Sequence, residues 1–471
     1  MLLKGKHMLI SKRAFLFASA SYFATARVGA FASGFDDMSY PHLVQGPMLG
    51  AVTPTEALIW TRANGEYEVE IRVDTDPLFK HPFVASRQLA KSENDFVTVH
   101  SINGLKENTN YYYRVFLNRG KALGQWARQL PDLSFLPPFN LKTAPALGSK
   151  TKFRLAFGSC ARLQGDPIQP IWNAVSLWKP DLFFWLGDNI YSDSKNPEII
   201  AGQYRQQRAV SSMQKVSRTV PQLAIWDDHD YGRNDYDRAN PIREESLDVF
   251  KRYWANPHYG LTNTPGVFFS YTYGGVDFFF LDGRYYRDSG EQPNNNNKTM
   301  LGSEQKEWLK KELLKSTAPF KFLICGTGWS NVGGQDLDSW SSFLNERNEI
   351  LDFIRDEGIG GVVLLSGDTH YGELNAIPWS EKGGYDFYNF VSSPLAQATS
   401  NKFLGRNPEV RIRTPYSGTT NFGVIDFDMT TDEPVLTFNL IGVHGGAVWE
   451  PLILKASELT NGVMTWENKI K

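Results

Sequence analysis

The stretch PDLFFWLGDNIY, residues 180–191, contains the pattern that decides the fold. A short apolar run ends at a glycine and is followed directly by acidic and polar side chains. A run of this kind, bounded by Pro and Gly, is typical of a strand that is buried on both faces of a sheet. Asp188 and Tyr191 therefore follow the carboxyl end of a predicted strand, which is where open α/β sheets place their ligands.

The same pattern recurs four times outside this stretch. The other apolar runs with a polar motif at their end are FRLAFGSC (153–160), QLAIWDDHD (222–230), VDFFFLDGR (276–284) and GGVVLLSGDTH (360–370). If these runs are buried strands of packed sheets, a thiol, a phenol, imidazoles and several carboxylates converge at their ends. Because a cluster of negative charges is costly to bury without cations, the pattern predicts a site for metal ions.

The segments between and after these motifs indicate the fold class. Helical spacing is present at 168–180, 197–218, 303–316 and 342–357, and further strand patterns are present at 385–393, 422–429 and 434–443. This mixture predicts an α+β domain over residues 150–450, in which two packed β-sheets are flanked by helices in αββα layers.

The preceding region has a different texture. Residues 38–145 contain alternating, β-branched and aromatic runs separated by turn residues, with no helical period between them. Residues 104–115 also resemble the tyrosine-corner region of fibronectin type III domains. We therefore predict a small fibronectin type III-like β-sandwich; the alternative is a set of hairpins that decorate the main domain. The Pro-rich stretch at 130–140 is interpreted as a linker.

The N-terminal segment has the pattern of an export signal. Residues 1–30 hold five basic side chains and no acidic one, and an apolar stretch follows Lys12-Arg13. The segment resembles a twin-arginine signal in which Lys12 replaces the first arginine, so the twin-arginine and general secretory routes both stay open. The alternative is a single uncleaved anchor. The prediction is a secreted or periplasmic protein that meets the export machinery.

Charge and hydropathy exclude two further classes of protein. The formal net charge of the 471 residues is −2, and without residues 1–30 there are 44 basic against 51 acidic side chains. This balance predicts no electrostatic nucleic-acid-binding surface. No later segment reaches the roughly 18 apolar residues that a transmembrane helix needs, so we expect no transmembrane segment in the mature chain.

The order of the motifs resembles that of the metallophosphoesterases, and within them of the PhoD-like alkaline phosphatases. The resemblance covers residues 150–445 and rests on Cys160, Asp188 with Tyr191, Asp228-His229 and Asp368-x-His370. The wider superfamily usually opens with Asp-x-His and continues with Gly-Asn-His and Gly-His-x-His. The departures at Ser159-Cys160, Asp227-Asp228-His229 and Gly367-Asp368-Thr369-His370 follow the PhoD-like pattern, and a preceding β-sandwich is also usual in that family.

The chemistry of the side chains suggests two cation sites. Asp188 has two oxygens with which it can bridge two cations, while Cys160, Tyr191 and His370 complete a mixed, anionic first site that suits a transition metal. The phenolate favours ferric iron, and this half resembles the iron site of purple acid phosphatases. Asp188, Asp228 and Asp368, with Asn234 as a further oxygen donor, form a second site that favours Ca²⁺ or Mg²⁺ over zinc. The family resemblance implies Fe³⁺ with Ca²⁺.

Several of these residues have a second interpretation. Cys160 is predicted as a metal ligand, and the alternatives are a thiol that only packs in the core and a disulfide with Cys325. His229 is predicted as the general acid, and the alternative is a histidine that only orients Asp228. Arg162 and Arg233 are candidates for binding phosphate oxygens or for structural salt bridges. Asp282 and Arg284 are interpreted as holding the end of their strand in place.

Together these features predict an exported, metal-dependent phosphoester hydrolase similar to alkaline phosphatase D. Two cations would clamp the phosphate, a metal-bound hydroxide would attack phosphorus, and His229 would protonate the leaving alkoxide. The near alternative is a phosphodiesterase or phospholipase D-like hydrolase, and the distant one is a non-catalytic surface-binding protein. Because every candidate ligand follows residue 150, we expect the sandwich to supply none.

Overall fold

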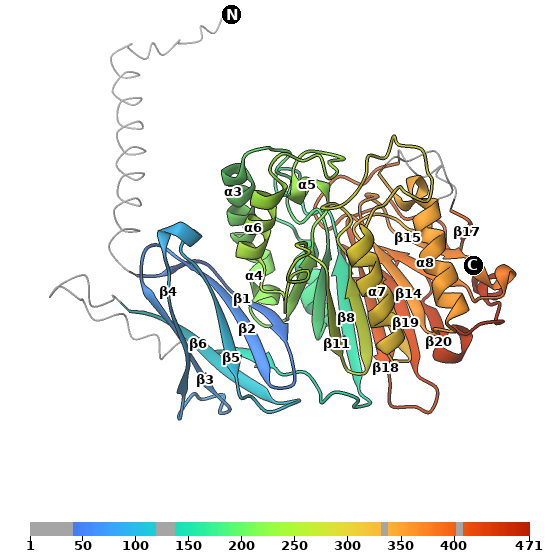
Figure 1. The fold of residues 1–471 in the computed structure, drawn as a ribbon. Helices are drawn as coiled ribbons and strands as arrows, with labels where there is room; N and C mark the ends of the chain where they lie inside the picture. The colour runs from blue at the N-terminus through green and yellow to red at the C-terminus, as the bar shows by residue number, and fades with distance from the viewer. Residues whose placement is uncertain (1–40, 119–136, 331–337, 402–407) are drawn as a thin grey trace, which may run out of the picture.

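The structure is a computed structural model that describes residues 41–118, 137–330, 338–401 and 408–471. Two small sheets and two large ones organise these residues (Figure 1). The predicted export signal lies outside the described residues, as does most of the predicted linker. Within the described ranges, no helix combines the length and the apolar character that a membrane crossing requires.

The N-terminal sheets form the predicted β-sandwich. The three-stranded sheet has the order β1-β2-β5 and the four-stranded sheet the order β4-β3-β6-β7. The strands are β1 (Leu43–Val52), β2 (Glu56–Ala63), β3 (Glu68–Asp74), β4 (Phe83–Leu89), β5 (Val97–Asn103), β6 (Asn110–Asn118) and β7 (Phe139–Lys142). The Tyr111 hydroxyl accepts a hydrogen bond of 2.8 Å from the backbone nitrogen of Lys106, which is the contact of a tyrosine corner. The sandwich prediction is thus confirmed over the decorating hairpins.

The two large sheets pack face to face. One has the order β10-β9-β8-β18-β19-β20 and the other the order β11-β12-β13-β14-β16-β15-β17. Their strands are β8 (Lys152–Gly158), β9 (Leu182–Leu186), β10 (Gln222–Ile225), β11 (Phe269–Tyr273), β12 (Val276–Phe280), β13 (Phe320–Ile324), β14 (Val362–Ser366), β15 (Glu373–Ile377), β16 (Phe387–Val391), β17 (Val410–Arg411), β18 (Asn421–Asp428), β19 (Val435–Gly442) and β20 (Leu452–Lys455). Phenylalanine rings fill the space between the sheets: Phe184 and Phe280 lie 4.8 Å apart, and Phe390 and Phe438 lie 4.3 Å apart.

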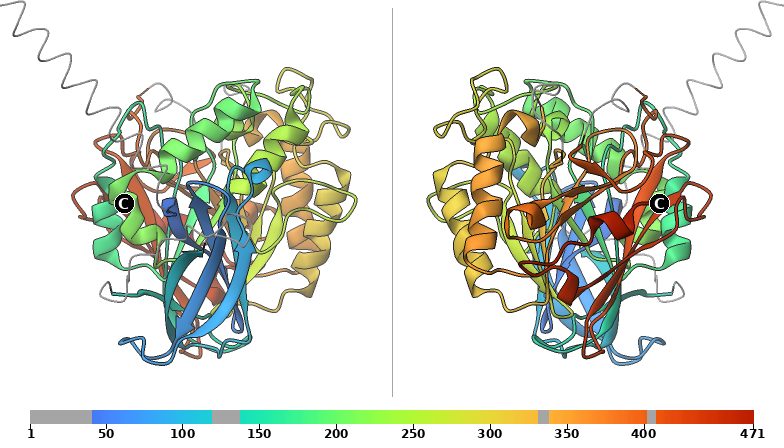
Figure 2. Two further views of the ribbon diagram at one scale, coloured as in Figure 1. Left: turned by 90° about the vertical axis from the view of Figure 1, so that its left-hand side faces the viewer. Right: turned by 90° about the vertical axis from the view of Figure 1, so that its right-hand side faces the viewer.

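Helices cover the outer faces of this pair. The helices are α2 (Ile171–Trp178), α3 (Pro197–Arg208), α4 (Ser211–Ser217), α5 (Asp228–Tyr231), α6 (Arg243–Tyr253), α7 (Ser303–Lys315) and α8 (Leu344–Asp356). Parallel strands need a crossover connection: α2 joins β8 to β9, α3 and α4 join β9 to β10, and α7 and α8 join β12, β13 and β14. The green helices α3 and α4 and the yellow-to-orange helices α7 and α8 lie on opposite sides of the sheets (Figure 2, left). The predicted αββα fold is confirmed.

The helical pattern at 197–218 belongs to two helices. α3 begins after Asn196, whose side chain accepts a hydrogen bond of 2.9 Å from the Glu198 nitrogen, with Pro197 in the first turn. Val210 then adopts an extended backbone, and α4 begins at the next residue. The residues on both sides keep the same helical periodicity, and for this reason the sequence pattern does not reveal the break.

The sandwich and the larger domain share one hydrophobic core. Buried residues of β1, β2 and β3 belong to the same cluster as those of the large sheets. The Tyr271 hydroxyl donates a hydrogen bond of 2.7 Å to the Val52 carbonyl, and the Ala51 nitrogen donates one of 2.9 Å to the Ala255 carbonyl. A β-carbon at Gly50 would lie 2.4 Å from that of Ala255, so only glycine permits this approach.

Candidate metal centre

The predicted motifs lie where their strands end, and several share an uncommon backbone conformation. Cys160, Asp188, Asp368 and His370 have φ angles of 60°, 51°, 69° and 58°. A left-handed conformation is unusual for residues other than glycine, asparagine and aspartate, and such strain concentrates at functional sites. At these four positions it turns the chain sharply just after β8, β9 and β14.

Four predicted ligands of the first site lie in mutual contact. The Tyr191 hydroxyl lies 3.2 Å from Asp188 Oδ2 and 3.0 Å from His370 Nε2. The Cys160 sulfur lies 3.5 Å from the same Asp188 oxygen. Ligand atoms of Cys160, Asp188 and His370 all lie within 4.8 Å of one another, which is close enough for a single ion to bind all of them.

The electrostatics of these residues fit a bound cation. Burial raises the pKa of Cys160 to about 12, and burial together with the Cys160 thiolate raises the pKa values of Asp188 and Tyr191 well above their usual values. Burial also lowers the pKa of His370 to about 4. The protein alone would keep this cluster neutral, so a cation that takes the place of the protons would stabilise the anionic forms. Asp188 Oδ1 is buried and has no hydrogen-bond partner among the described residues.

A second group shares Asp188 with the first. Ligand atoms of Asp188, Asp228 and His229 also lie within 4.8 Å of one another. Burial alone would raise the pKa of Asp228, but the neighbouring charge of Arg284 and other partners keep it below its usual value. The backbone nitrogen of Asp235 donates a hydrogen bond of 2.7 Å to Asp228 Oδ2. Asp228 is therefore a buried carboxylate that is held as an anion beside Asp188.

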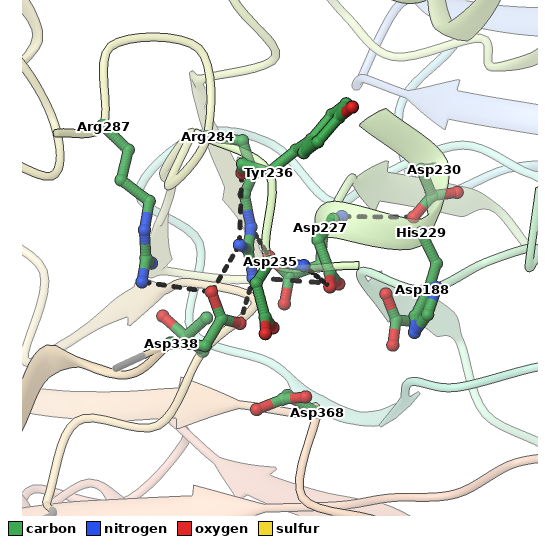
Figure 3. A network of polar contacts seen from close by, with 12 residues as sticks. Asp188, Asp227, His229, Asp230, Asp235, Tyr236, Arg284, Arg287, Asp338 and Asp368 are labelled. Atoms are coloured by element: carbon green, nitrogen blue, oxygen red, sulfur yellow. Dashed lines mark hydrogen bonds and ion pairs between the residues drawn. The ribbon is translucent and has the colours of Figure 1, made fainter. Parts of the chain in front are cut away.

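Asp368 and Asn234, the other predicted ligands of this second site, lie differently. The Asp368 carboxylate belongs to neither group, although its charge adds to burial in raising the pKa of Cys160. The close-up view shows Asp368 on the opposite side of the site from Asp227 (Figure 3). Asn234 is exposed in the turn after α5. Within the described residues, the second group thus rests on Asp188, Asp228 and His229.

His229 forms a pair with a carboxylate that the sequence motifs did not single out. Its Nδ1 lies 2.6 Å from Asp193 Oδ1, and its ring packs against Tyr191 with the centroids 4.1 Å apart and the planes tilted by 34°. Burial would lower the pKa of His229, but the charges of Asp228 and Asp193 raise it above its usual value. This arrangement favours a protonated imidazole next to the two acidic groups.

Arg284 neutralises a third acidic group behind the site. Its buried guanidinium forks onto both oxygens of Asp338 at 2.6 Å each and also contacts Asp227. Arg287 contacts Asp338 from the other side at 3.1 Å (Figure 3). The backbone nitrogen of Arg284 donates a hydrogen bond of 2.9 Å to Asp282 Oδ1, as expected for residues that hold the strand end in place. Arg284 lies 3.8 Å from Asp228, so the network supports a candidate ligand.

Removing Arg284 should destabilise the protein strongly. Arg284→Met leaves Asp227 buried without its cation and leaves Asp338 with Arg287 alone, and breaking a buried pair in this way costs about 3–5 kcal/mol. Urea unfolding of the variant measures this loss. Lys152→Met is the matched control, because Lys152 pairs with Asp428 at 2.6 Å in a largely exposed position, where a pair contributes about 0–1 kcal/mol. Equal losses in the two variants would contradict the role assigned to the network.

The predicted phosphate-binding arginines are both exposed. The Arg162 guanidinium lies over the Tyr191 ring, 5.5 Å from its centroid, and is thus close to the first site. Arg233 lies in the turn after α5. Both cysteines are free thiols; Cys325 is buried, and its sulfur lies 3.7 Å from the Thr327 hydroxyl. Cys160 and Cys325 therefore form no disulfide, and that alternative is wrong.

Comparison with known proteins agrees with this geometry. The family model of the PhoD-like phosphatases matches residues 155–434, and the model of their N-terminal domain matches residues 30–129. The chain belongs to the PhoD-like phosphatase family. Membership makes it a phosphoester hydrolase and implies a metal cofactor, in agreement with the charge and burial of the two groups.

Individual relatives share both sequence and fold. Alkaline phosphatase D of Bacillus subtilis (strain 168) is 26% identical over 481 aligned positions, which cover 85% of this chain and 78% of that protein. A solved structure of PhoD superposes with a TM-score of 0.73 at 20% identity, covering 89% of this chain and 91% of that one. Purple acid phosphatase PPD1 from yellow lupin (Lupinus luteus) superposes with a TM-score of 0.62 at 14% identity, covering 88% and 74%. Both structures share the fold of this PhoD-like phosphatase.

Proposed function

We propose that the chain is an exported, metal-dependent phosphoester hydrolase of the alkaline phosphatase D type. The observation that carries this proposal is the contact between Cys160, Asp188, Tyr191 and His370, beside Asp228 and His229, where the strands end. A non-catalytic binding protein has no use for so many buried ionisable groups, whose burial without cations is costly.

The donor atoms suggest a different cation for each group. A thiolate, a phenolate, an imidazole and a carboxylate in the first group suit Fe³⁺, because soft and hard anionic donors together favour a transition metal. Asp188 and Asp228 supply oxygen donors that suit Ca²⁺ or Mg²⁺. Asp368 and Asn234, which lie outside this group in the structure, would add their oxygens by turning toward the cation. Bound cations would polarise the phosphoryl oxygens and lower the pKa of the attacking water.

The side chains around the cations supply the remaining steps. His229 gives its proton to the leaving oxygen, since Nδ1 is held by Asp193 and Nε2 is left for the substrate. Arg162, which lies over Tyr191, and Arg233 bind non-bridging phosphate oxygens.

We also propose the organisation of the whole chain. Residues 1–30 form the export signal, residues 38–145 the N-terminal sandwich and residues 150–450 the catalytic domain. A buried site that needs two different cations is consistent with export of the folded, loaded protein by the twin-arginine route. The exported enzyme then acts in the periplasm or outside the cell.

Metal analysis combined with a substrate comparison tests the proposed function. Purified native protein should contain iron and a labile divalent cation, and chelation should abolish hydrolysis of p-nitrophenyl phosphate. The rate on bis-p-nitrophenyl phosphate, measured in parallel, decides between a monoesterase and a phosphodiesterase. A metal-free protein with full activity would overturn the proposal.

The iron site has a spectroscopic signature of its own. A Tyr191 phenolate bound to Fe³⁺ should produce a visible charge-transfer band, which Tyr191→Phe should abolish. Cys160→Ser should lower iron affinity by roughly tenfold or more, because it replaces a direct ligand and loss of even an outer partner costs about 10–100-fold in metal affinity. Cys325→Ser is the matched control, since that thiol contacts Thr327 instead. Iron loss of equal size in the two cysteine variants would refute the assignment.

A further inference from the structure

A single carboxylate ties together the two loops that carry Asp188 and Asp228. Asp230 Oδ2 accepts hydrogen bonds of 3.1 Å from the backbone nitrogen of Asn189 and of 3.1 Å from that of Asp227. Asn189 directly follows Asp188, and Asp227 directly precedes Asp228. Figure 3 shows the link from Asp230 to Asp227 as a dashed line. Asp230 therefore links the backbone next to Asp188 with the backbone next to Asp228.

The other oxygen of Asp230 is held from the neighbouring helix. Asp230 Oδ1 accepts a hydrogen bond of 2.6 Å from the Tyr204 hydroxyl of α3. The Tyr204 ring stacks on Tyr253 of α6, with centroids 5.2 Å apart and planes at 13°. All three residues are fully or almost fully buried. A buried carboxylate with all these partners has little freedom to move independently of α3 and α6.

The same pair of helices is fastened to the sandwich at Asp95. The Tyr253 hydroxyl donates to Asp95 Oδ2, and Arg205 of α3 reaches the same oxygen at 2.9 Å. Within the sandwich, Arg62 of β2 binds the other oxygen at 2.8 Å. Asp95 is thus a joint between the two domains that contacts both helices at once.

We propose that Asp230 and Tyr204 are positioning residues for the second cation site, and that the sandwich supports them through Asp95 and Tyr253. This inference rests on the proposed function of the site. The predicted ligands all follow residue 150, and the sandwich holds the two helices against which Asp230 is fastened. Its role is to keep Asp188 and Asp228 at the separation that a shared cation requires.

Outer partners of metal ligands have measurable effects on cation binding. Their removal typically costs about 10–100-fold in metal affinity or activity. Tyr204→Phe deletes only the hydroxyl and leaves one oxygen of Asp230 without its buried donor, so the affinity for the labile divalent cation should fall by roughly 10-fold or more. Asp95→Asn weakens the joint from the other end, and we expect a smaller loss of several-fold in the same affinity.

The matched control is Tyr271→Phe. Tyr271 is also a buried tyrosine whose hydroxyl crosses the domain interface, to the Val52 carbonyl, but its partner has no link to Asp230. The measurement is calorimetric titration of Ca²⁺ or Mg²⁺ into full-length protein depleted of its labile cation. Melting temperature and kcat on p-nitrophenyl phosphate are recorded beside it. The control should lose stability as Tyr204→Phe does, with unchanged cation affinity.

The double variant Asp95→Asn with Tyr204→Phe tests whether the contacts act as one unit. If Asp95 acts through Tyr253 and Tyr204, the double variant should bind the cation within about twofold of Tyr204→Phe alone, because coupled residues are not additive. If the losses multiply, or if Tyr204→Phe matches Tyr271→Phe, the inference is wrong. Failure of the proposed function would give a different result, because the wild-type protein itself would then bind no cation or hydrolyse no ester.

Discussion

Replacing Asp188 with asparagine should remove most of the hydrolytic activity, with kcat/KM lower by roughly 10³-fold or more. Asp188 is the residue that the two groups of candidate ligands share, so its loss weakens both sites at once. Metal ions contribute several kcal/mol of charge stabilisation in the transition state, and each 1.36 kcal/mol corresponds to a factor of ten in rate. The Asn variant keeps one oxygen and the size of the side chain, so the fold should persist while iron and the divalent cation are lost.

The other end of the same strand offers a control for this experiment. Asp181 precedes β9 as Asp188 follows it, and its Oδ2 accepts a hydrogen bond of 2.8 Å from the Arg154 nitrogen. Asp181→Asn should keep full metal content and near wild-type kcat/KM. Elemental analysis and steady-state rates of both variants give the comparison. Stoichiometric metal and near wild-type activity in Asp188→Asn would remove Asp188 from the centre of the site.

The His229→Asn variant should lose activity in a manner that depends on the leaving group. A general acid contributes about 10²–10⁴-fold, and it matters most when the leaving oxygen is basic. The expected loss in kcat is therefore about 10²–10⁴-fold on an alkyl phosphate and far smaller on p-nitrophenyl phosphate, whose phenolate leaves without a proton. The ratio of the two losses is the quantity to measure, because effects on folding or on substrate access cancel in it.

Metal occupancy separates this role from two others. His229 also lies within ligand distance of Asp188 and Asp228, and it is adjacent in sequence to Asp228. If His229 binds the cation itself, or merely orients Asp228, the Asn variant should lose divalent cation and both substrates should suffer equally. A full complement of metal with a loss confined to the alkyl ester supports the acid. Equal losses with depleted metal would remove His229 from the catalytic residues.

The sequence predicts the frame of the site because that frame is local. A fully buried strand is recognisable from an apolar run such as LFFWL before Gly187, and the residues after such a run lie at the carboxyl end of the strand. Cys160, Asp188, Tyr191 and His370 come into contact because the ends of three such strands, β8, β9 and β14, lie close together. The tyrosine corner at Tyr111 is similarly predictable, because its partner Lys106 lies only five residues away.

The partners around the site are not predictable in this way because they come from distant segments. Arg284 and Asp338 are 54 residues apart, Tyr204 and Asp230 are 26 apart, and neither pair has a local sequence pattern. The turn after α5 shows a finer limit. Asp235 has a φ of 61°, and its backbone nitrogen turns toward Asp228 while Asn234 stays exposed. A pattern of residue types cannot tell that the backbone of Asp235, and not the side chain of Asn234, contacts Asp228.

The close approach of Gly50 to Ala255 has a consequence for the ancestry and engineering of this protein. A junction that admits no β-carbon at one position, and that lies within a shared core, can be inherited only as a matched pair of surfaces. Exchange of the N-terminal region between relatives would place unmatched side chains at this seam, so recombination at the linker should rarely yield viable hybrids. A designer who wishes to add a targeting module would do better to append it to an existing terminus than to replace the sandwich.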